Sequence, residues 1–118
     1  MHELSIAQAI VDVAVRHAGM SQVERVHVRI GHLRQVVPPA LAFSFELCAH
    51  GTALEGAELV IESVPIAVVC RACAARSALE SFPLACRACG GLTVDVVRGE
   101  ELQVMELELR EALLTSGG

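Results

Sequence analysis

Four of the five cysteines in this 118-residue chain fall into two Cys-x-x-Cys pairs, a spacing that predicts metal chemistry. The pairs are Cys70 with Cys73 and Cys86 with Cys89, with twelve residues between them. Each pair can direct two sulfurs toward one point, and two pairs can form the tetrahedral thiolate set of a structural Zn²⁺ site. The separation lies just below the usual range of about 15–20 residues. We therefore predict a four-cysteine zinc site.

Two disulfides or a redox pair are the alternatives for these cysteines. The start of the chain lacks the basic stretch and apolar run of a signal peptide, and no apolar run approaches the roughly 20 residues of a membrane span. We therefore expect a cytoplasmic, membrane-free protein whose thiols stay reduced. The fifth cysteine, Cys48, lies in an apolar stretch and is expected to be a small buried residue.

The charge and aromatic content argue against a nucleic-acid partner. The chain has nine arginines, no lysine and fourteen acidic residues, for a formal net charge of −5. The arginines are scattered, whereas a duplex-binding domain carries a basic patch. An aromatic content of 3% also leaves few side chains for stacking on bases. A zinc-ribbon adaptor for protein or nucleic acid is the alternative to the function inferred below.

A second metal site is suggested by the first three residues. His2 directly follows Met1, so the α-amine, the amide nitrogen of His2 and its imidazole can converge on one ion. Glu3 could complete the set through its amide or its carboxylate. Planar nitrogen coordination favours Ni²⁺ or Cu²⁺ over Zn²⁺. A histidine at position 2 of a chain is usually just part of a solvated terminus, so the residues alone leave both interpretations open.

The element that must position His2 is a helix near the start of the chain. Ser5 and Gln8 have the spacing of a capping box, apolar residues recur behind them at helical spacing, and Gly19 is a natural stop. We therefore predict a helix from Ser5 to Ala18, preceded by a short mobile head, Met1–Leu4.

The remaining patterns predict an α+β fold, a small three-stranded sheet with two helices and an inserted zinc-ribbon-like module. Alternating or helical periodicity places strands at 22–30, 57–64 and 101–109 and a second helix at 38–49. The predicted division is a discontinuous α/β domain at 1–65 and 99–110, which would be the nickel-binding domain if His2 is a ligand, a zinc-binding domain at 66–98, and a flexible tail at 111–118.

Three features together resemble the HypA/HybF hydrogenase maturation factors and span residues 1–109. They are the start Met1-His2-Glu3-Leu4-Ser5-Ile6; the middle motifs Ile30-Gly31-His32-Leu33, Val36-Val37-Pro38, Phe43-Ser44-Phe45-Glu46, Gly51-Thr52 and Glu55-Gly56-Ala57; and the knuckle Cys86-Arg87-Ala88-Cys89-Gly90 with Gly99-Glu100-Glu101-Leu102. The resemblance implies a nickel metallochaperone with a zinc domain inserted into its α/β domain.

The resemblance also implies roles and partners. His2 and the backbone at His2 and Glu3 would hold nickel, and the four cysteines would hold structural zinc. This protein, working with the GTPase HypB, would deliver nickel to the large-subunit precursor of a nickel-iron hydrogenase. Some members of the family also serve urease. The sequence shows no nucleophile–base motif and no Gly-rich phosphate loop, so we expect a carrier, monomeric or homodimeric, and not an enzyme.

Overall fold

The computed structural model describes residues 2–110, which fall into two compact units. Of the described residues, unit 1 comprises 2–28, 37–60 and 104–110, and unit 2 comprises 29–36 and 61–103. The tail predicted at 111–118 lies outside the described residues, and the domain boundaries inferred from the sequence stay a prediction. No helix in the described part of the chain has the length and apolar character needed to cross a bilayer.

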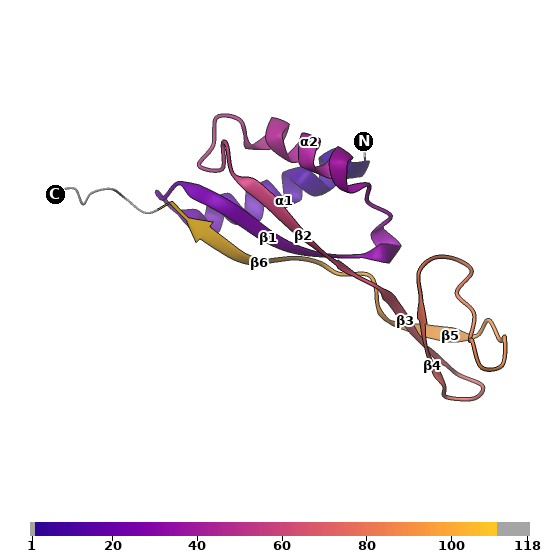
Figure 1. Ribbon diagram of the computed structural model, residues 1–118. Helices are drawn as coiled ribbons and strands as arrows, with labels where there is room; N and C mark the ends of the chain where they lie inside the picture. Colours follow the sequence, from indigo (N-terminus) through magenta and orange to yellow (C-terminus); the bar gives the residue numbers. More distant parts are fainter. Residues whose placement is uncertain (1, 111–118) are drawn as a thin grey trace. The chain divides into compact units, whose positions relative to one another are not determined.

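The fold class predicted from the sequence is confirmed. Helices α1 (His2–Ala18) and α2 (Pro38–Ala49) pack against each other, and Figure 1 shows them together on one side of the strands. The three-stranded sheet has the order β2-β1-β6 and is formed by β1 (Val23–Gly31), β2 (Glu58–Val64) and β6 (Leu102–Leu109). The chain therefore leaves this sheet after β2 and returns to it with β6.

The prediction of a capped helix beginning at Ser5 is wrong, because α1 already includes His2. Ser5 lies inside the helix, and Gln8 donates to Asp12 Oδ1 at 2.8 Å instead of closing a capping box. Glu3 stands in the first turn, where a carboxylate suits the positive end of the helix dipole. Its Oε2 also accepts the Val37 N–H at 3.1 Å, a contact from a distant part of the sequence that holds the first turn.

The apolar residues of both helices contribute to the core of unit 1. Ile6, Ile10 and Val11 of α1 are buried, as are Leu41 and Phe45 of α2. Cys48 is only partly buried, so the expectation of a small buried residue at this position is wrong. It lies in the last turn of α2, where it lines a surface pocket together with Val11 and Val15 of α1.

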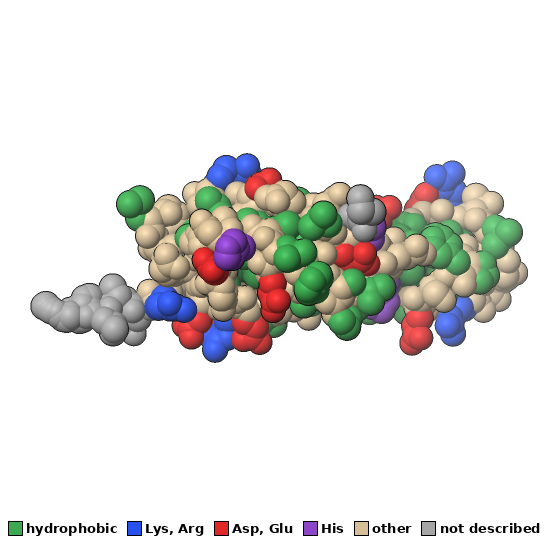
Figure 2. Space-filling model, turned by 90° about the horizontal axis from the view of Figure 1, so that it is seen from above, with side chains coloured by type: hydrophobic (Ala, Val, Ile, Leu, Met, Phe, Trp, Pro, Cys, Tyr) green, Lys and Arg blue, Asp and Glu red, His purple; other side chains and the backbone are tan. Residues whose placement is uncertain are grey.

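The outer side of the helices is also apolar. Figure 2 looks onto this side and shows hydrophobic side chains gathered over the helices of unit 1. On the helices and directly before α2, the exposed large apolar side chains are Leu4, Val37, Phe43 and Leu47, with exposed fractions of 42, 55, 61 and 57%. The α2 helix is thus hydrophobic on its buried side and on its exposed side, unlike an ordinary amphipathic surface helix.

Unit 2 contains a second sheet that the sequence analysis did not predict. Strand β3 (Ile66–Cys70) pairs antiparallel with β4 (Arg76–Leu79) and β5 (Val94–Arg98), in the order β4-β3-β5. Ile66, Val68 and Leu79 form its small core. Strands of four or five residues carry too little alternation to be recognised from the sequence alone.

Gly31 and Gly99 approach each other more closely than any side chain would allow. A Cβ built on Gly31 would lie 1.9 Å from the Gly99 carbonyl oxygen. Two backbone hydrogen bonds use this approach, from the Gly31 N–H to the Glu101 carbonyl at 2.9 Å and from the Leu33 N–H to the Gly99 carbonyl at 2.8 Å. Glycine at position 31 is therefore required to hold 31–33 against 99–101 within unit 2.

Candidate metal centres

The four paired cysteines converge on one point. Cys70 ends β3, whereas the second pair lies in the loop between β4 and β5. The Cys70 and Cys89 sulfurs are 3.7 Å apart and those of Cys73 and Cys86 are 3.6 Å apart, and all four lie within 4.8 Å of one another. A tetrahedron with zinc–sulfur bonds of about 2.3 Å has sulfur–sulfur edges of about 3.8 Å. The spacing fits a four-thiolate metal site and excludes disulfides, whose sulfurs are about 2.05 Å apart.

The two Cys-x-x-Cys turns have the same backbone form. In the first, the Ala74 N–H donates to the Cys70 carbonyl at 2.9 Å; in the second, the Gly90 N–H donates to the Cys86 carbonyl at 2.8 Å. The donating residue is left-handed in both, with φ of 66° at Ala74 and 76° at Gly90. Each turn therefore needs a residue that tolerates positive φ directly after its second cysteine.

Backbone N–H groups aim at the sulfur of the first cysteine in each turn. The Cys89 and Ala88 N–H groups lower the pKa of the Cys86 thiol to about 6, and Ala88 N lies 3.3 Å from the Cys86 sulfur. The Cys73 N–H is the largest cause of the lowered pKa of Cys70. Donated N–H groups favour the thiolate, which is the form that binds a metal.

The second cysteine of each turn behaves in the opposite way. The Ala75 N–H favours the Cys73 thiolate, but the nearby sulfurs, Cys86 first, and partial burial raise the pKa of Cys73 to about 11. The pKa of Cys89 is also raised, because neighbouring sulfurs outweigh the N–H of Gly91. Four sulfurs this close cannot all be anionic without a cation, so the cluster is suited to a divalent ion.

The other predicted centre lies at the beginning of α1. The His2 side chain is 50% exposed, and its Nδ1 is 3.8 Å from Glu3 Oε2. The Val37 N–H is the largest cause of the lowered pKa of Glu3. The N–H groups of a first helical turn have no acceptor within the helix, so the amide nitrogens here are not committed to helix bonds. Met1 lies outside the described residues, so its amine is not placed.

One neighbourhood of metal-ligating residues was missed by the sequence analysis. The structure brings His27 of β1 beside Glu106 and Glu108 of β6. The three ligand atoms lie within 4.8 Å of one another. The alternation of β1 and β6 was visible in the sequence, but the pairing of these two distant strands was not.

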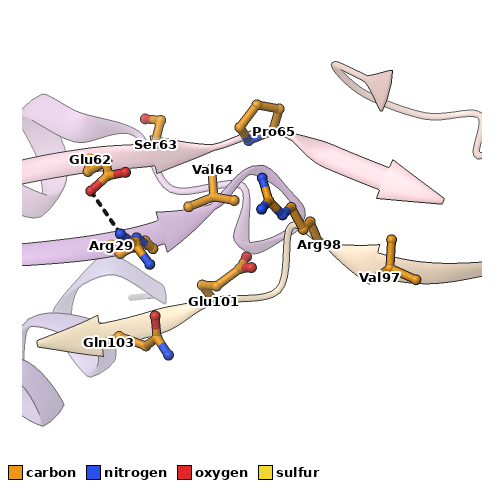
Figure 3. Close-up of a pocket in the computed structure, with 9 residues that line it drawn as sticks. All are labelled: Arg29, Glu62, Ser63, Val64, Pro65, Val97, Arg98, Glu101 and Gln103. Carbon is orange, nitrogen blue, oxygen red and sulfur yellow. Dashed lines mark hydrogen bonds and ion pairs between the residues drawn. The ribbon is translucent and has the colours of Figure 1, made fainter. Parts of the chain in front are cut away.

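A pocket of about 550 Å³ lies within unit 2, between the ends of β2 and β5 and the beginning of β6 (Figure 3). Its charged side chains are Arg29, Arg98, Glu62 and Glu101, and Arg29 Nη2 is 3.5 Å from Glu62 Oε1. Two basic and two acidic groups balance, and the lining contains neither cysteine nor histidine. None of the predicted metal ligands lines this pocket.

Comparison with known proteins gives the family. Residues 1–109 match the family model described as "Hydrogenase/urease nickel incorporation, metallochaperone, hypA". The chain belongs to the HypA family. This confirms the resemblance inferred from the sequence motifs. The family is one of metallochaperones and maturation factors.

Curated relatives from the HypA family match over nearly their whole length. The hydrogenase maturation factor HypA of Geotalea uraniireducens is 48% identical over 109 residues, which are 92% of this chain and 99% of the relative. The HypA of a Nostoc species is 43% identical over 111 residues, or 94% and 97% of the two chains.

A solved structure supports the fold. The solution structure of the nickel metallochaperone HypA from Helicobacter pylori matches with a TM-score of 0.66 and 22% identity, over 92% of this chain and 97% of that one. At this identity the similarity bears on the fold alone.

Proposed function

We propose that this protein carries Ni²⁺ at its N-terminal end and delivers it during maturation of a nickel-iron hydrogenase. The observation that carries the proposal is the HypA family match over residues 1–109. His2 and Glu3 are the proposed nickel ligands, with the Met1 amine as a further donor. The exposed imidazole of His2 supports this role, because a partner's ligands can reach an ion held there.

The four cysteines are proposed to hold a structural Zn²⁺. Sulfur–sulfur distances of 3.6 and 3.7 Å and the N–H groups aimed at sulfur support this assignment. Four thiolates fill all four positions of a tetrahedral zinc ion, so the ion would organise the two turns and leave no open position for a substrate. The proposed domain division, 1–65 with 99–110 for nickel and 66–98 for zinc, follows from the same assignment.

The proposed partners are the GTPase HypB and the large-subunit precursor of the hydrogenase, in the cytoplasm. The family description also includes urease, so a urease is a second class of recipient. Family membership favours this carrier over a zinc-ribbon adaptor, whose N-terminus would not matter.

The N-terminal mechanism is tested by metal titration of three zinc-loaded proteins. These are the native chain, a chain with one residue added before Met1, and His2→Ala. We expect the native chain to bind one more Ni²⁺ ion than either variant, with one zinc in all three, because the extension moves the α-amine away from His2 and the substitution removes the imidazole. Nickel binding by the extended chain with native affinity would contradict the use of the amine. Nickel binding by His2→Ala with native affinity would contradict the assignment of His2.

A further inference from the structure

We propose that His27, Glu106 and Glu108 form a second divalent-metal site in unit 1, which takes Ni²⁺ through one imidazole and two carboxylates. The site lies on β1 and β6, which are neighbours in the sheet. It shares no ligand with His2 or with the cysteines. It therefore goes beyond the proposed function and does not depend on it.

The sheet places the three ligands together. His27 alternates with Val26 and Val28, which are fully buried, so its imidazole lies on the face of β1 opposite the core. His27 Nε2 is 2.5 Å from Glu108 Oε2, and the nearest ligand atoms of all three residues lie within 4.8 Å of one another. Ligands on adjacent strands have fixed backbones, so binding an ion requires only small side-chain rotations.

The donor set decides the class of ion. Imidazole suits Ni²⁺, Zn²⁺ and Cu²⁺, whereas carboxylates alone would suit Mg²⁺, Ca²⁺ and Mn²⁺. One imidazole with two carboxylates therefore favours a borderline transition-metal ion. Water would complete the coordination, because Glu106 is exposed and His27 and Glu108 are only partly buried.

The Arg25 guanidinium would compete with a metal ion for the Glu108 carboxylate. Its Nη1 is 2.5 Å from Glu108 Oε1, and its Nε is 3.1 Å from Glu58 Oε1. When an ion binds, Arg25 can stay paired with Glu58 while the Glu108 carboxylate coordinates the metal. Three carboxylates and one guanidinium sum to a charge of about −2, which a divalent ion neutralises.

Because Arg25 competes for Glu108, removing its charge should raise nickel affinity, whereas removing a ligand should lower it. In the zinc-loaded His2→Ala chain, which lacks the N-terminal nickel ligand, Ni²⁺ is titrated by calorimetry. We expect one bound ion, a loss of affinity of at least about tenfold in His27→Ala and in Glu106→Gln, and a gain of about tenfold in Arg25→Gln. The gain corresponds to removing a unit charge roughly 6 Å from a divalent ion in water.

Matched controls separate the site from general charge effects. His17→Ala removes an exposed helical histidine, and Glu62→Gln removes a carboxylate of β2 paired with Arg29; neither should change nickel binding. Bound Ni²⁺ should also broaden the ring NMR signals of His27 but not those of His17.

Either of two results would overturn the proposal: unchanged nickel affinity in His27→Ala and Glu106→Gln, or no gain in Arg25→Gln. The proposed function is judged on a different comparison, the native chain against His2→Ala. Its failure would leave the outcome at His27 unaffected.

Discussion

The four-cysteine cluster and the beginning of α1 differ in how firmly the chain fixes their ligands. In the cluster, two turns of identical form hold four sulfurs, and Cys70 and Cys86 are buried. At the beginning of α1, the exposed imidazole of His2 lies in the first helical turn. Outside the helix itself, the hydrogen bond from the Val37 N–H to Glu3 contacts this turn.

This difference matches the difference between a resident ion and a cargo ion. A saturated, partly buried thiolate set retains its metal and stabilises the fold around it. An exposed site with few protein ligands lets another protein replace those ligands one at a time. The predictions below alter one centre at a time and ask whether the other is affected.

The largest effect is expected from Cys86→Ala. Removing one of four thiolates should reduce bound zinc from about one ion per chain to none and disorder the loops around β3, β4 and β5, because the ion links both turns. Metal analysis and amide NMR signals provide the measurement, and Cys48→Ala, outside the cluster, is the control. Nickel binding at His2 should persist, and full zinc content in Cys86→Ala would disprove the four-cysteine assignment.

Zinc uptake at about pH 7.5 should release about two to three protons. The raised pKa values of Cys73 and Cys89 keep these two groups protonated in the zinc-free protein, whereas a Cys86 pKa of about 6 means that this group is already ionised. Calorimetry in buffers of different ionisation enthalpy measures the number. Zinc affinity should fall as the pH drops, because the thiolates regain protons, and release of four protons would contradict the lowered pKa of Cys86.

Ala74→Gly should stabilise the cluster by about 1 kcal/mol, because Ala74 has a φ of 66° and glycine adopts this conformation without the Cβ penalty. Chemical denaturation of the zinc-loaded protein measures the gain. Gly90→Ala, at the matching position of the second turn, should lose a similar amount. Equal stability of all three proteins would show that the turns tolerate either residue.

The smallest effect is expected from Glu3→Gln, which separates the structural role of this carboxylate from nickel binding. The lowered pKa of Glu3 means that the native chain gains stability above the unfolded-state pKa of about 4.5 and loses it as the pH falls through the lower folded-state pKa. The stability difference between native chain and variant should therefore be greatest at neutral pH and shrink below about pH 4.

Nickel affinity of Glu3→Gln should stay near native if Glu3 contributes its amide. A large loss of nickel affinity would instead assign the carboxylate to the ion. His2→Ala serves as the matched comparison, because it should lose the N-terminal nickel ion without this pH-dependent change in stability.

The sequence by itself determined the features that depend on local spacing. Two Cys-x-x-Cys steps specify two turns, alternation in 22–30 and 101–109 specifies two strands, and Pro38 with Pro39 starts a helix that ends at Ala49. Each of these patterns is read within one stretch of chain, because helical and strand periodicities are local properties. The metal chemistry of the cysteines was predictable for the same reason.

Only the tertiary structure decided the features that join distant residues. The helix begins at His2 and not at Ser5, with its first turn held by the Val37 N–H, 34 positions away from Glu3. The cluster of His27 with Glu106 and Glu108 exists because β6 lies beside β1. Such contacts depend on how elements pack and not on any single pattern, so the spacing of residues along the chain cannot specify them.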